Sequence, residues 1–373
     1  MDNANMNLRG GLPRFKEKLD GSAQVVVAYL GGSITEGAGA SDADATSWRA
    51  LTDRYLKDRY SEKRIKCINA GVGGTNSTFG AHRLYEHVFS QGEIDLLFVE
   101  FSVNDGEDRM ESIRGMEGIV RQCRRISAQT DICFVYTAAD KNLSEELPFN
   151  VAVHEEVASH YGIPSISFAA RIRQREYAGE GSWGELANDR VHPNDAGHAL
   201  YAEYMREMLE LVLGDAERSE IGDTEGSVSL PKPLIETNFE HAAMHGLRTA
   251  TESNDFILTG TYPGPMMNWR YKIDHLHSDS PDAGLTLSVT GRSAGLLLLC
   301  GPDSGIFEYS LDGITFNKVN LFDEWCLMAY RPIIVLFPLL EEATDMRIVV
   351  RNKAMKDERS TGNGLRILRI LSN

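Results

Sequence analysis

The sequence predicts a two-domain protein, in which an α/β domain with a parallel sheet precedes an all-β sandwich. The chain has 373 residues, a length for which two domains are the usual expectation. Short apolar runs alternate with amphipathic stretches from about residue 24 to 213, and helical patterns nearly vanish after residue 231. With 42% hydrophobic residues, the chain has enough apolar side chains to fill two cores.

Five short strands are expected in the first domain, and together they are rich in Val, Ile, Phe and Leu at both odd and even positions. This is typical of strands that helices cover on both faces. The expected strands span 24–30, 64–69, 94–101, 131–137 and 163–167. The helical patterns between and after them span 46–60, 78–90, 110–128, 145–161 and 194–213. This alternation predicts a parallel sheet with helices on both sides, and ligands of such sheets bind at the carboxyl ends of the strands.

The composition changes after residue 213, so we assign residues 1–213 to the first domain. Residues 214–230 hold five acidic residues and three glycines without apolar periodicity, which predicts a linker. Short strand-like runs separated by Gly and Asp turns then predict a β-sandwich over residues 231–373. These runs span 255–259, 284–290, 294–300, 306–311, 332–338, 344–351 and 364–371.

Charge and cysteine content limit the partners and the compartment. The net charge is −16, from 54 acidic and 38 basic residues, and nucleic-acid phosphates repel such a surface. The five cysteines include no C-x-x-C pair, as expected for reduced thiols in the cytoplasm. The first residues lack the pattern of a signal peptide, and the apolar runs are too short to span a bilayer. We therefore expect a cytoplasmic protein with no nucleic acid and no membrane among its partners.

A candidate nucleophile follows the first expected strand. Ser33 lies in AYLGGSITEG, residues 28–37, between an apolar run and residues that can open a helix. A turn of this kind lifts a hydroxyl above the sheet, and the helix N-terminus supplies free N–H groups. The alternative is an ordinary Gly-Gly-Ser loop, because so short a motif is weak by itself.

A nucleophilic serine needs a base, and the base needs a carboxylate that orients it. The stretch NDRVHPNDAGHALYA, residues 188–202, places Asp189 three residues before His192, and Asn194 is a candidate N-cap for the helix that follows. Such a loop can direct the carboxylate to Nδ1 of the ring and leave Nε2 facing the serine. The alternative is a surface loop with a solvated aspartate.

Acyl transfer also needs hydrogen-bond donors for the oxyanion that develops in the transition state. Two stretches that follow expected strands qualify. In NAGVGGTNS, residues 69–77, glycines let a backbone N–H approach a ligand closely. In VEFSVND, residues 99–105, Asn104 offers a side-chain amide where a strand ends. Each stretch could alternatively be no more than a tight turn.

Together, the four blocks around Ser33, Gly74, Asn104 and Asp189-x-x-His192 resemble the motifs of the SGNH (GDSL-like) hydrolase family, in the same order. The resemblance covers roughly residues 20–213. It implies a three-layer α/β/α fold with a flavodoxin-like parallel sheet. It also implies that Ser33 is the nucleophile, that His192 is the general base and then the acid, and that Asp189 orients His192.

The same resemblance implies an oxyanion hole made of the Ser33 and Gly74 N–H groups and the Asn104 side chain. Gly73 would replace Gly74 if the turn shifts by one residue. No metal and no organic cofactor are implied. The chain departs from the family's usual Gly-Asp-Ser by having Gly32 in place of aspartate, and it has Ser102-Val103 where Gly-Thr is common.

The whole layout is similar to that of carbohydrate acetylesterases that carry a jelly-roll-like, carbohydrate-binding-module-like second domain. This resemblance implies a serine esterase that acts on acetylated oligosaccharides, with manno-oligosaccharides favoured and xylo-oligosaccharides next. Two alternatives stay open: a lysophospholipase or thioesterase of the same superfamily, and a non-catalytic carbohydrate-binding protein. Whether the protein forms a homodimer also stays open.

Two tryptophans are candidate substrate contacts, because flat aromatic faces stack on sugar rings. Trp183 lies in a glycine-rich loop just before the Asp189 block, and Trp325 lies in the second domain. Core packing is the alternative for both. His241 and His245 stand four apart without the glutamate of an H-E-x-x-H motif, so we expect no metal site there. Four histidines of the first domain's predicted helices are expected at the surface or core edge: His82, His87, His154 and His160.

Overall fold

The computed structural model describes residues 5–214, 230–247 and 250–373, which form two compact units. The first unit extends to Glu240 and the second begins at His241, rather than at residue 231. Residues 215–229, most of the linker expected over 214–230, lie outside the described residues. Each unit is described by itself.

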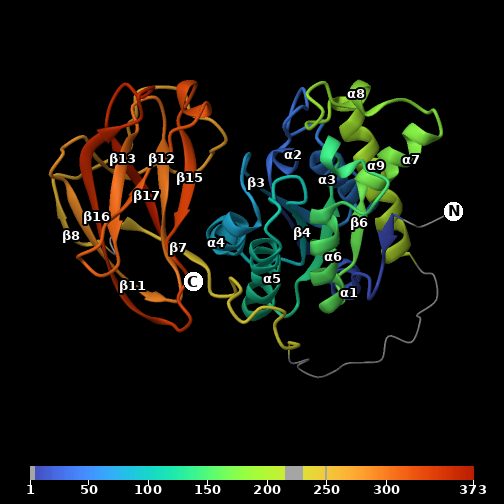
Figure 1. The fold of residues 1–373 in the computed structure, drawn as a ribbon. Helices are drawn as coiled ribbons and strands as arrows, with labels where there is room; N and C mark the ends of the chain where they lie inside the picture. Colours follow the sequence, from blue (N-terminus) through green and yellow to red (C-terminus); the bar gives the residue numbers. More distant parts are fainter. Residues whose placement is uncertain (1–4, 215–229, 248–249) are drawn as a thin grey trace. The chain divides into compact units, whose positions relative to one another are not determined.

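A mostly parallel sheet forms the centre of the first unit, as predicted (Figure 1). Its strand order is β1-β6-β5-β4-β2-β3, and every neighbouring pair is parallel except β1 with β6. Without the short edge strand β1, this is the flavodoxin-like order, which reverses between β2 and β4. The strands are β1 (Met6–Asn7), β2 (Gln24–Gly31), β3 (Arg64–Gly71), β4 (Leu96–Glu100), β5 (Asp131–Tyr136) and β6 (Ser165–Ser167).

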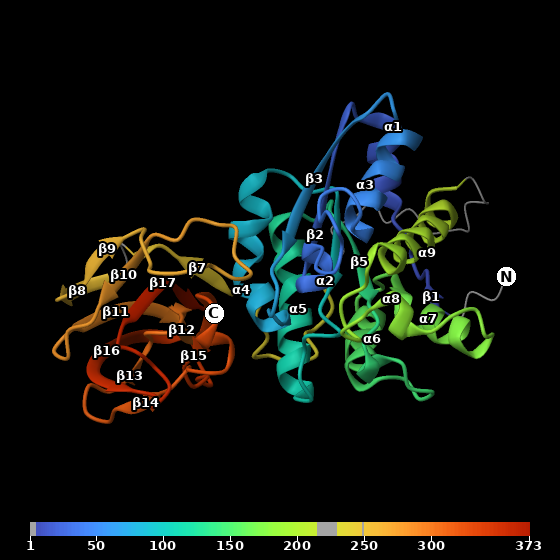
Figure 2. The ribbon, with the colours of Figure 1, turned by 90° about the horizontal axis from the view of Figure 1, so that it is seen from above.

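Helices cover both faces of this sheet, with α4, α5 and α6 on one side and α1, α3 and α9 on the other (Figure 2). Side-chain caps fix several helix starts, among them Ser47 for α3, Asn76 for α4 and, as predicted, Asn194 for α9. No helix of the described residues is long and apolar enough to cross a membrane. The helices are α1 (Pro13–Gly21), α2 (Ser33–Glu36), α3 (Trp48–Arg59), α4 (Ser77–His87), α5 (Arg109–Ile126), α6 (Phe149–His160), α7 (Phe168–Tyr177), α8 (Trp183–Leu186) and α9 (Asp195–Leu213).

Residues 230–240 belong to the first unit because they pack on α5. The buried carboxylate of Glu117 accepts the backbone N–H groups of Leu234 and Ile235, at 2.6 and 2.9 Å. Gly118 has no side chain at the point where Phe239 crosses the helix, and a Cβ there would lie 2.7 Å from the Phe239 side chain. The α/β unit therefore includes this segment, which has no helical or strand pattern of its own.

The second unit is a sandwich of two antiparallel sheets, as predicted. One sheet has the order β15-β12-β17-β10-β9 with β7 also paired to β17, and the other has the order β14-β13-β16-β11-β8. Leu296 and Ile367 from the first sheet share one core with Leu287 and Ile348 from the second. The strands are β7 (Ala243–His245), β8 (Ala250–Asn254), β9 (Ile257–Thr259), β10 (His275–Ser278), β11 (Gly284–Gly291), β12 (Ala294–Cys300), β13 (Gly305–Ser310), β14 (Asn317–Val319), β15 (Arg331–Leu336), β16 (Thr344–Lys356) and β17 (Leu365–Ser372).

The histidines of the first unit correct one expectation. His82, His87 and His154 are fully buried, whereas His160 is exposed. His82 donates from Nδ1 to the Thr78 carbonyl oxygen at 2.8 Å and lies against Phe239. Burial lowers the pKa of His82 to about 4, although the hydrogen bond to Thr78 acts in the opposite direction. The folded protein therefore keeps this ring neutral at neutral pH.

We predict that His82 makes the free energy of unfolding depend on pH. Between about pH 6.5 and 4 the unfolded chain protonates this residue and the folded chain does not, so stability falls as the pH falls. His82→Asn keeps a donor near the Thr78 carbonyl. It should reduce the slope of the free energy of unfolding against pH by an amount that corresponds to at most about one bound proton. Urea titrations at a series of pH values between about 4 and 7 measure the difference. Identical slopes for the two proteins would contradict the prediction.

Candidate active site

Ser33 lies where the strand order of the sheet reverses, at the carboxyl end of β2. It is the first residue of the short helix α2, and Gly32 before it is extended. The Ser33 carbonyl accepts the N–H groups of Gly37 and Ala38, which closes the turn tightly. The sequence thus places the hydroxyl at the edge of the sheet where ligands of open α/β sheets bind.

Ser33, His192 and Asp189 form one continuous chain of hydrogen bonds. The Ser33 Oγ lies 2.7 Å from the His192 Nε2, and the His192 Nδ1 lies 2.6 Å from the Asp189 Oδ2. The other carboxylate oxygen, Oδ1, accepts the backbone N–H groups of Val191 and His192 at 3.0 and 2.7 Å. The structure therefore brings together the three residues that the sequence singled out.

The charge on Asp189 sets the tautomer of the histidine. Partial burial raises the pKa of this carboxyl, but the hydrogen bonds from His192 and Val191 outweigh that effect and hold the pKa below its usual range. A charged carboxylate only accepts hydrogen bonds, so Nδ1 carries a proton and Nε2 is free to accept the proton of Ser33. This is the arrangement that a serine nucleophile requires.

The donors expected for an oxyanion hole lie around the same turn. The Asn104 side chain packs against Gly32, because a Cβ at Gly32 would lie 2.1 Å from the Asn104 Oδ1. Neither the Asn104 amide nor the Ser33 and Gly74 N–H groups make a hydrogen bond within the described chain. The Gly73 N–H instead donates to the Glu36 Oε2 at 2.8 Å. Of the two glycines, Gly74 is therefore the one whose N–H is available.

The chain matches the model of the GDSL-like lipase/acylhydrolase family over residues 29–200, a segment that contains all of these side chains. Residues 29–200 form a GDSL-like lipase/acylhydrolase domain. The GDSL-like domain identifies the protein as a carboxylic ester hydrolase. No curated protein sequence matches the chain significantly.

Two solved structures share the fold of both units. A two-domain esterase (CEX) active on acetylated mannans, crystallised with mannopentaose, matches with a TM-score of 0.82 and 23% identity, over 99% of this chain and 97% of that chain. Another structure of a two-domain esterase (CEX) active on acetylated mannans has a TM-score of 0.84 and 22% identity, with the same coverage. A catalytic mutant of Axe2, an acetylxylan esterase from Geobacillus stearothermophilus, covers 52% of this chain and 95% of its own, with 18% identity and a TM-score of 0.41.

Trp183 is a core residue and cannot stack on a sugar as we had expected. Its side chain is fully buried and lies parallel to the ring of Tyr201. Its indole N–H donates to the Arg190 carbonyl oxygen at 3.0 Å, directly between Asp189 and His192 in the sequence. Core packing, the alternative weighed from the sequence, is thus what the structure shows. The indole supports the loop that carries Asp189 and His192.

Two buried carboxylates of the GDSL-like domain escaped the sequence analysis. Glu100 accepts the hydroxyls of Thr35 in α2 and Thr137 after β5, both at 2.9 Å, and burial raises its pKa above the usual range despite these bonds. Asp105 accepts from Ser77 at 2.7 Å and lies 2.8 Å from the His154 Nε2. The only sequence signal was that both lie in the Asn104 block. Their partners come from distant elements.

We predict that Gly32→Ala lowers kcat without unfolding the protein. The new Cβ would displace the end of the Asn104 side chain, which is flexible, rather than backbone atoms. Loss of one oxyanion donor costs about 10²- to 10³-fold in kcat. Steady-state kinetics on an aryl acetate measure the loss, and a melting curve checks the fold. Unchanged kcat in a folded variant would show that Asn104 does not act as a donor.

Proposed function

We propose that the protein is a serine esterase that removes O-acetyl groups from hemicellulose oligosaccharides through an acetyl-serine intermediate. The observation that carries the proposal is the hydrogen-bonded chain from Ser33 through His192 to Asp189. The free donors of Ser33, Gly74 and Asn104 beside this chain support it, because acyl transfer needs both a nucleophile and an oxyanion hole.

In the first step, Ser33 Oγ attacks the acetyl carbonyl carbon while His192 Nε2 takes the serine proton. The negative charge that develops on the carbonyl oxygen is stabilised by the N–H groups of Ser33 and Gly74 and the amide of Asn104. The bond from the acetyl carbon to the sugar oxygen then breaks, and His192 gives its proton to the leaving hydroxyl. Asp189 stays charged and stabilises the imidazolium.

In the second step, water hydrolyses the acetyl-serine. His192 Nε2 takes a proton from the water as its oxygen attacks the acetyl carbon, and the same oxyanion donors act again. The bond between this carbon and the Ser33 Oγ breaks, Ser33 regains its proton from His192, and acetate leaves. Every proton transfer uses the one ring that lies 2.7 Å from the serine.

For the substrate, the similarity over both units to an esterase active on acetylated mannans favours manno-oligosaccharides. Xylo-oligosaccharides stay the second candidate. Fold alone does not select a substrate, so this choice is part of the proposal. A cytoplasmic location, which we also propose, would fit imported oligosaccharides rather than polymer.

We predict that the protein removes acetyl groups stepwise from acetylated manno-oligosaccharides. Mass spectrometry of manno- and xylo-oligosaccharide mixtures before and after incubation measures this. Ser33→Ala should lower kcat by about 10⁴-fold or more, because the nucleophile is lost. Asp189→Asn keeps the shape of the loop and should cost somewhat less.

The controls separate chemistry from substrate choice. If neither mixture loses acetyl groups but an aryl acetate is still hydrolysed, the protein is an esterase and these oligosaccharides are not its substrates. Activity on acyl-CoA or lysophospholipid alone would indicate a thioesterase or lysophospholipase. Full activity of Ser33→Ala on all of these substrates would exclude the acetyl-serine mechanism.

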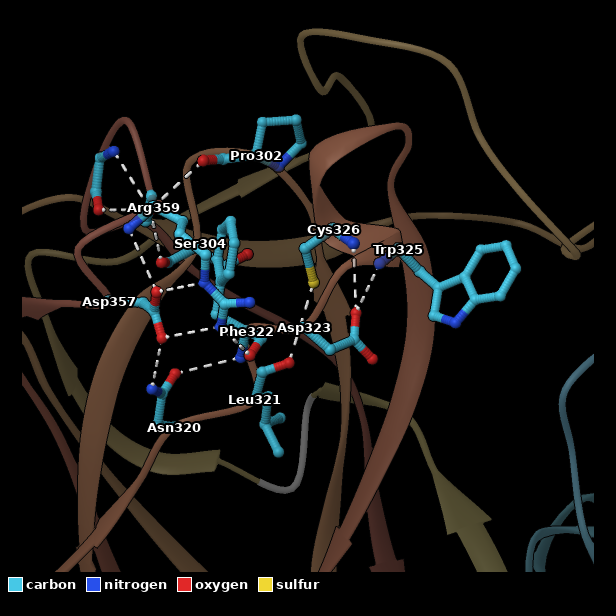
Figure 3. Close-up of polar contacts among 12 residues, drawn as sticks. Pro302, Ser304, Asn320, Leu321, Phe322, Asp323, Trp325, Cys326, Asp357 and Arg359 are labelled. Carbon is cyan, nitrogen blue, oxygen red and sulfur yellow. Dashed lines mark hydrogen bonds and ion pairs between the residues drawn. The ribbon is translucent and has the colours of Figure 1, made fainter.

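Trp325 remains the candidate sugar contact in the second unit. It lies in a short 3-10 helix, Trp325–Leu327, and about half of its side chain is exposed. Asp323 accepts the backbone N–H groups of Trp325 and Cys326, at 3.0 and 3.2 Å, and so holds the turn (Figure 3). The indole points away from these hydrogen bonds. We propose that this exposed ring stacks on sugar units of the substrate.

We predict that Trp325→Ala raises KM for acetylated oligosaccharides and leaves turnover of a small aryl acetate unchanged. Loss of a stacking face costs roughly 1 kcal/mol, or about fivefold in KM. Met328→Ala is the matched control, because Met328 is an exposed apolar side chain of the same segment. Steady-state kinetics on both substrates measure the difference. Equal effects of the two variants would assign Trp325 no specific contact.

A further inference from the structure

Arg83 is a fully buried arginine of α4, and the hydrolytic mechanism does not use it. Its guanidinium donates to three oxygens near the catalytic turn. Nη1 donates to the Ala70 carbonyl at 2.5 Å, and Nη2 donates to the Gly31 carbonyl at 2.7 Å and to the Thr75 hydroxyl at 3.2 Å. One planar group therefore contacts the ends of β2 and β3 and the loop that follows β3.

These three oxygens belong to the segments that carry the nucleophile and the oxyanion donor. Gly31 ends β2, two residues before Ser33, and its carbonyl also accepts the Val72 N–H at 3.0 Å. Ala70 and Thr75 bracket the turn that contains Gly74. The guanidinium thus bridges the backbone before Ser33 and the turn that contains Gly74, and it fixes the distance between them.

The third element of the site also lies against Arg83. The guanidinium carbon is 5.9 Å from the ring centroids of Phe79 and Phe101. Phe101 begins the turn of Asn104, since its carbonyl accepts the Asn104 N–H at 2.9 Å. Arg83 therefore contacts the segments of all three proposed oxyanion donors: Ser33, Gly74 and Asn104.

We propose that Arg83 is a positioning residue that holds the three segments of the oxyanion hole at the spacing the transition state requires. The inference rests on the proposed function, because it assumes that Ser33, Gly74 and Asn104 act together on the acetyl group. Arginine suits this role because its rigid fork donates in fixed directions, whereas a lysine ammonium is a point charge on a flexible stem.

A purely structural role makes a different prediction. A buried cation that only stabilises the fold would, when replaced, lower the free energy of unfolding and leave kcat of the folded protein unchanged. A positioning role lowers kcat in the protein that remains folded, because misplacement of reacting groups by about 1 Å can cost about 10²-fold in rate. The two roles are thus separated by kcat of the folded fraction.

The test uses the full-length protein and an aryl acetate, with Arg83→Lys, Thr75→Val and the double variant. Arg83→Lys keeps the charge and removes the fork. Thr75→Val removes one acceptor and also the hydrogen bond that the Thr75 hydroxyl donates to the Val72 carbonyl at 2.7 Å. We expect kcat to fall by about 10- to 100-fold for Arg83→Lys and less for Thr75→Val, with KM changed by less than about threefold. Because the two side chains share a hydrogen bond, the double variant should lose less than the product of the single losses.

Two control variants match these changes. Thr75→Ser keeps the hydroxyl and should restore most of the activity lost in Thr75→Val. Arg124→Lys changes a half-buried arginine, which donates to the Thr130 carbonyl at 2.5 Å, next to the amino end of β5. Arg124 lies near the amino ends of the strands, whereas Ser33 lies at their carboxyl ends. The substitution should therefore lower stability and leave kcat unchanged.

Binding of an alkyl boronic acid gives a readout that does not depend on turnover. Such a compound forms a tetrahedral adduct with the serine oxygen, so its affinity should fall in parallel with kcat/KM in the Arg83→Lys variant. Wild-type kcat and boronate affinity in folded Arg83→Lys would overturn the inference. If Arg83→Lys does not fold, wild-type kcat of Thr75→Val overturns it. Failure of the proposed function itself would show separately, as full activity of Ser33→Ala.

Discussion

The candidate active site depends on the close approach of three backbone segments at the carboxyl ends of β2, β3 and β4. Two glycines make this approach sterically possible. At Gly71, a Cβ would lie 2.2 Å from the backbone nitrogen of Glu36, so any side chain would push α2 away from β3. At Gly32, a Cβ would lie 2.1 Å from the Asn104 side chain. The serine turn and the groups that would hold an oxyanion lie in contact only because neither position has a side chain.

The two halves of the candidate catalytic site are held in place by different kinds of contact. Ser33 follows a central strand whose Val27, Ala28 and Tyr29 are fully buried, so the packed sheet fixes its position. Asp189 and His192 lie on a loop in which the Asp189 side chain is 57% exposed. That loop is ordered by local hydrogen bonds and by Trp183 beneath it. Packing therefore positions the serine, whereas polar contacts position the histidine.

The sequence predicted the sheet well and singled out the three residues that the structure joins by hydrogen bonds, because both leave local patterns. The long apolar strands and the Asp189-x-x-His192 loop are readable from neighbouring residues alone. The short strands β10 and β14 were missed, since HLHS and NKV show no apolar alternation. Burial of Trp183 and the contacts of Arg83 could not be read either. Both depend on which distant segments meet at the residue, and neither spacing nor composition records that.

The first and last residues of the second unit lie next to each other. The backbone N–H of His241, its first residue, donates to the Asn373 side chain at 3.2 Å, and the Asn373 carbonyl accepts the N–H groups of Arg292 and Ser293. A polypeptide can therefore enter and leave this sandwich at almost the same point. Modules with adjacent ends can be placed within a surface loop of another protein without stretching it. The geometry of this unit is therefore compatible with insertion into another domain as well as with fusion to a terminus.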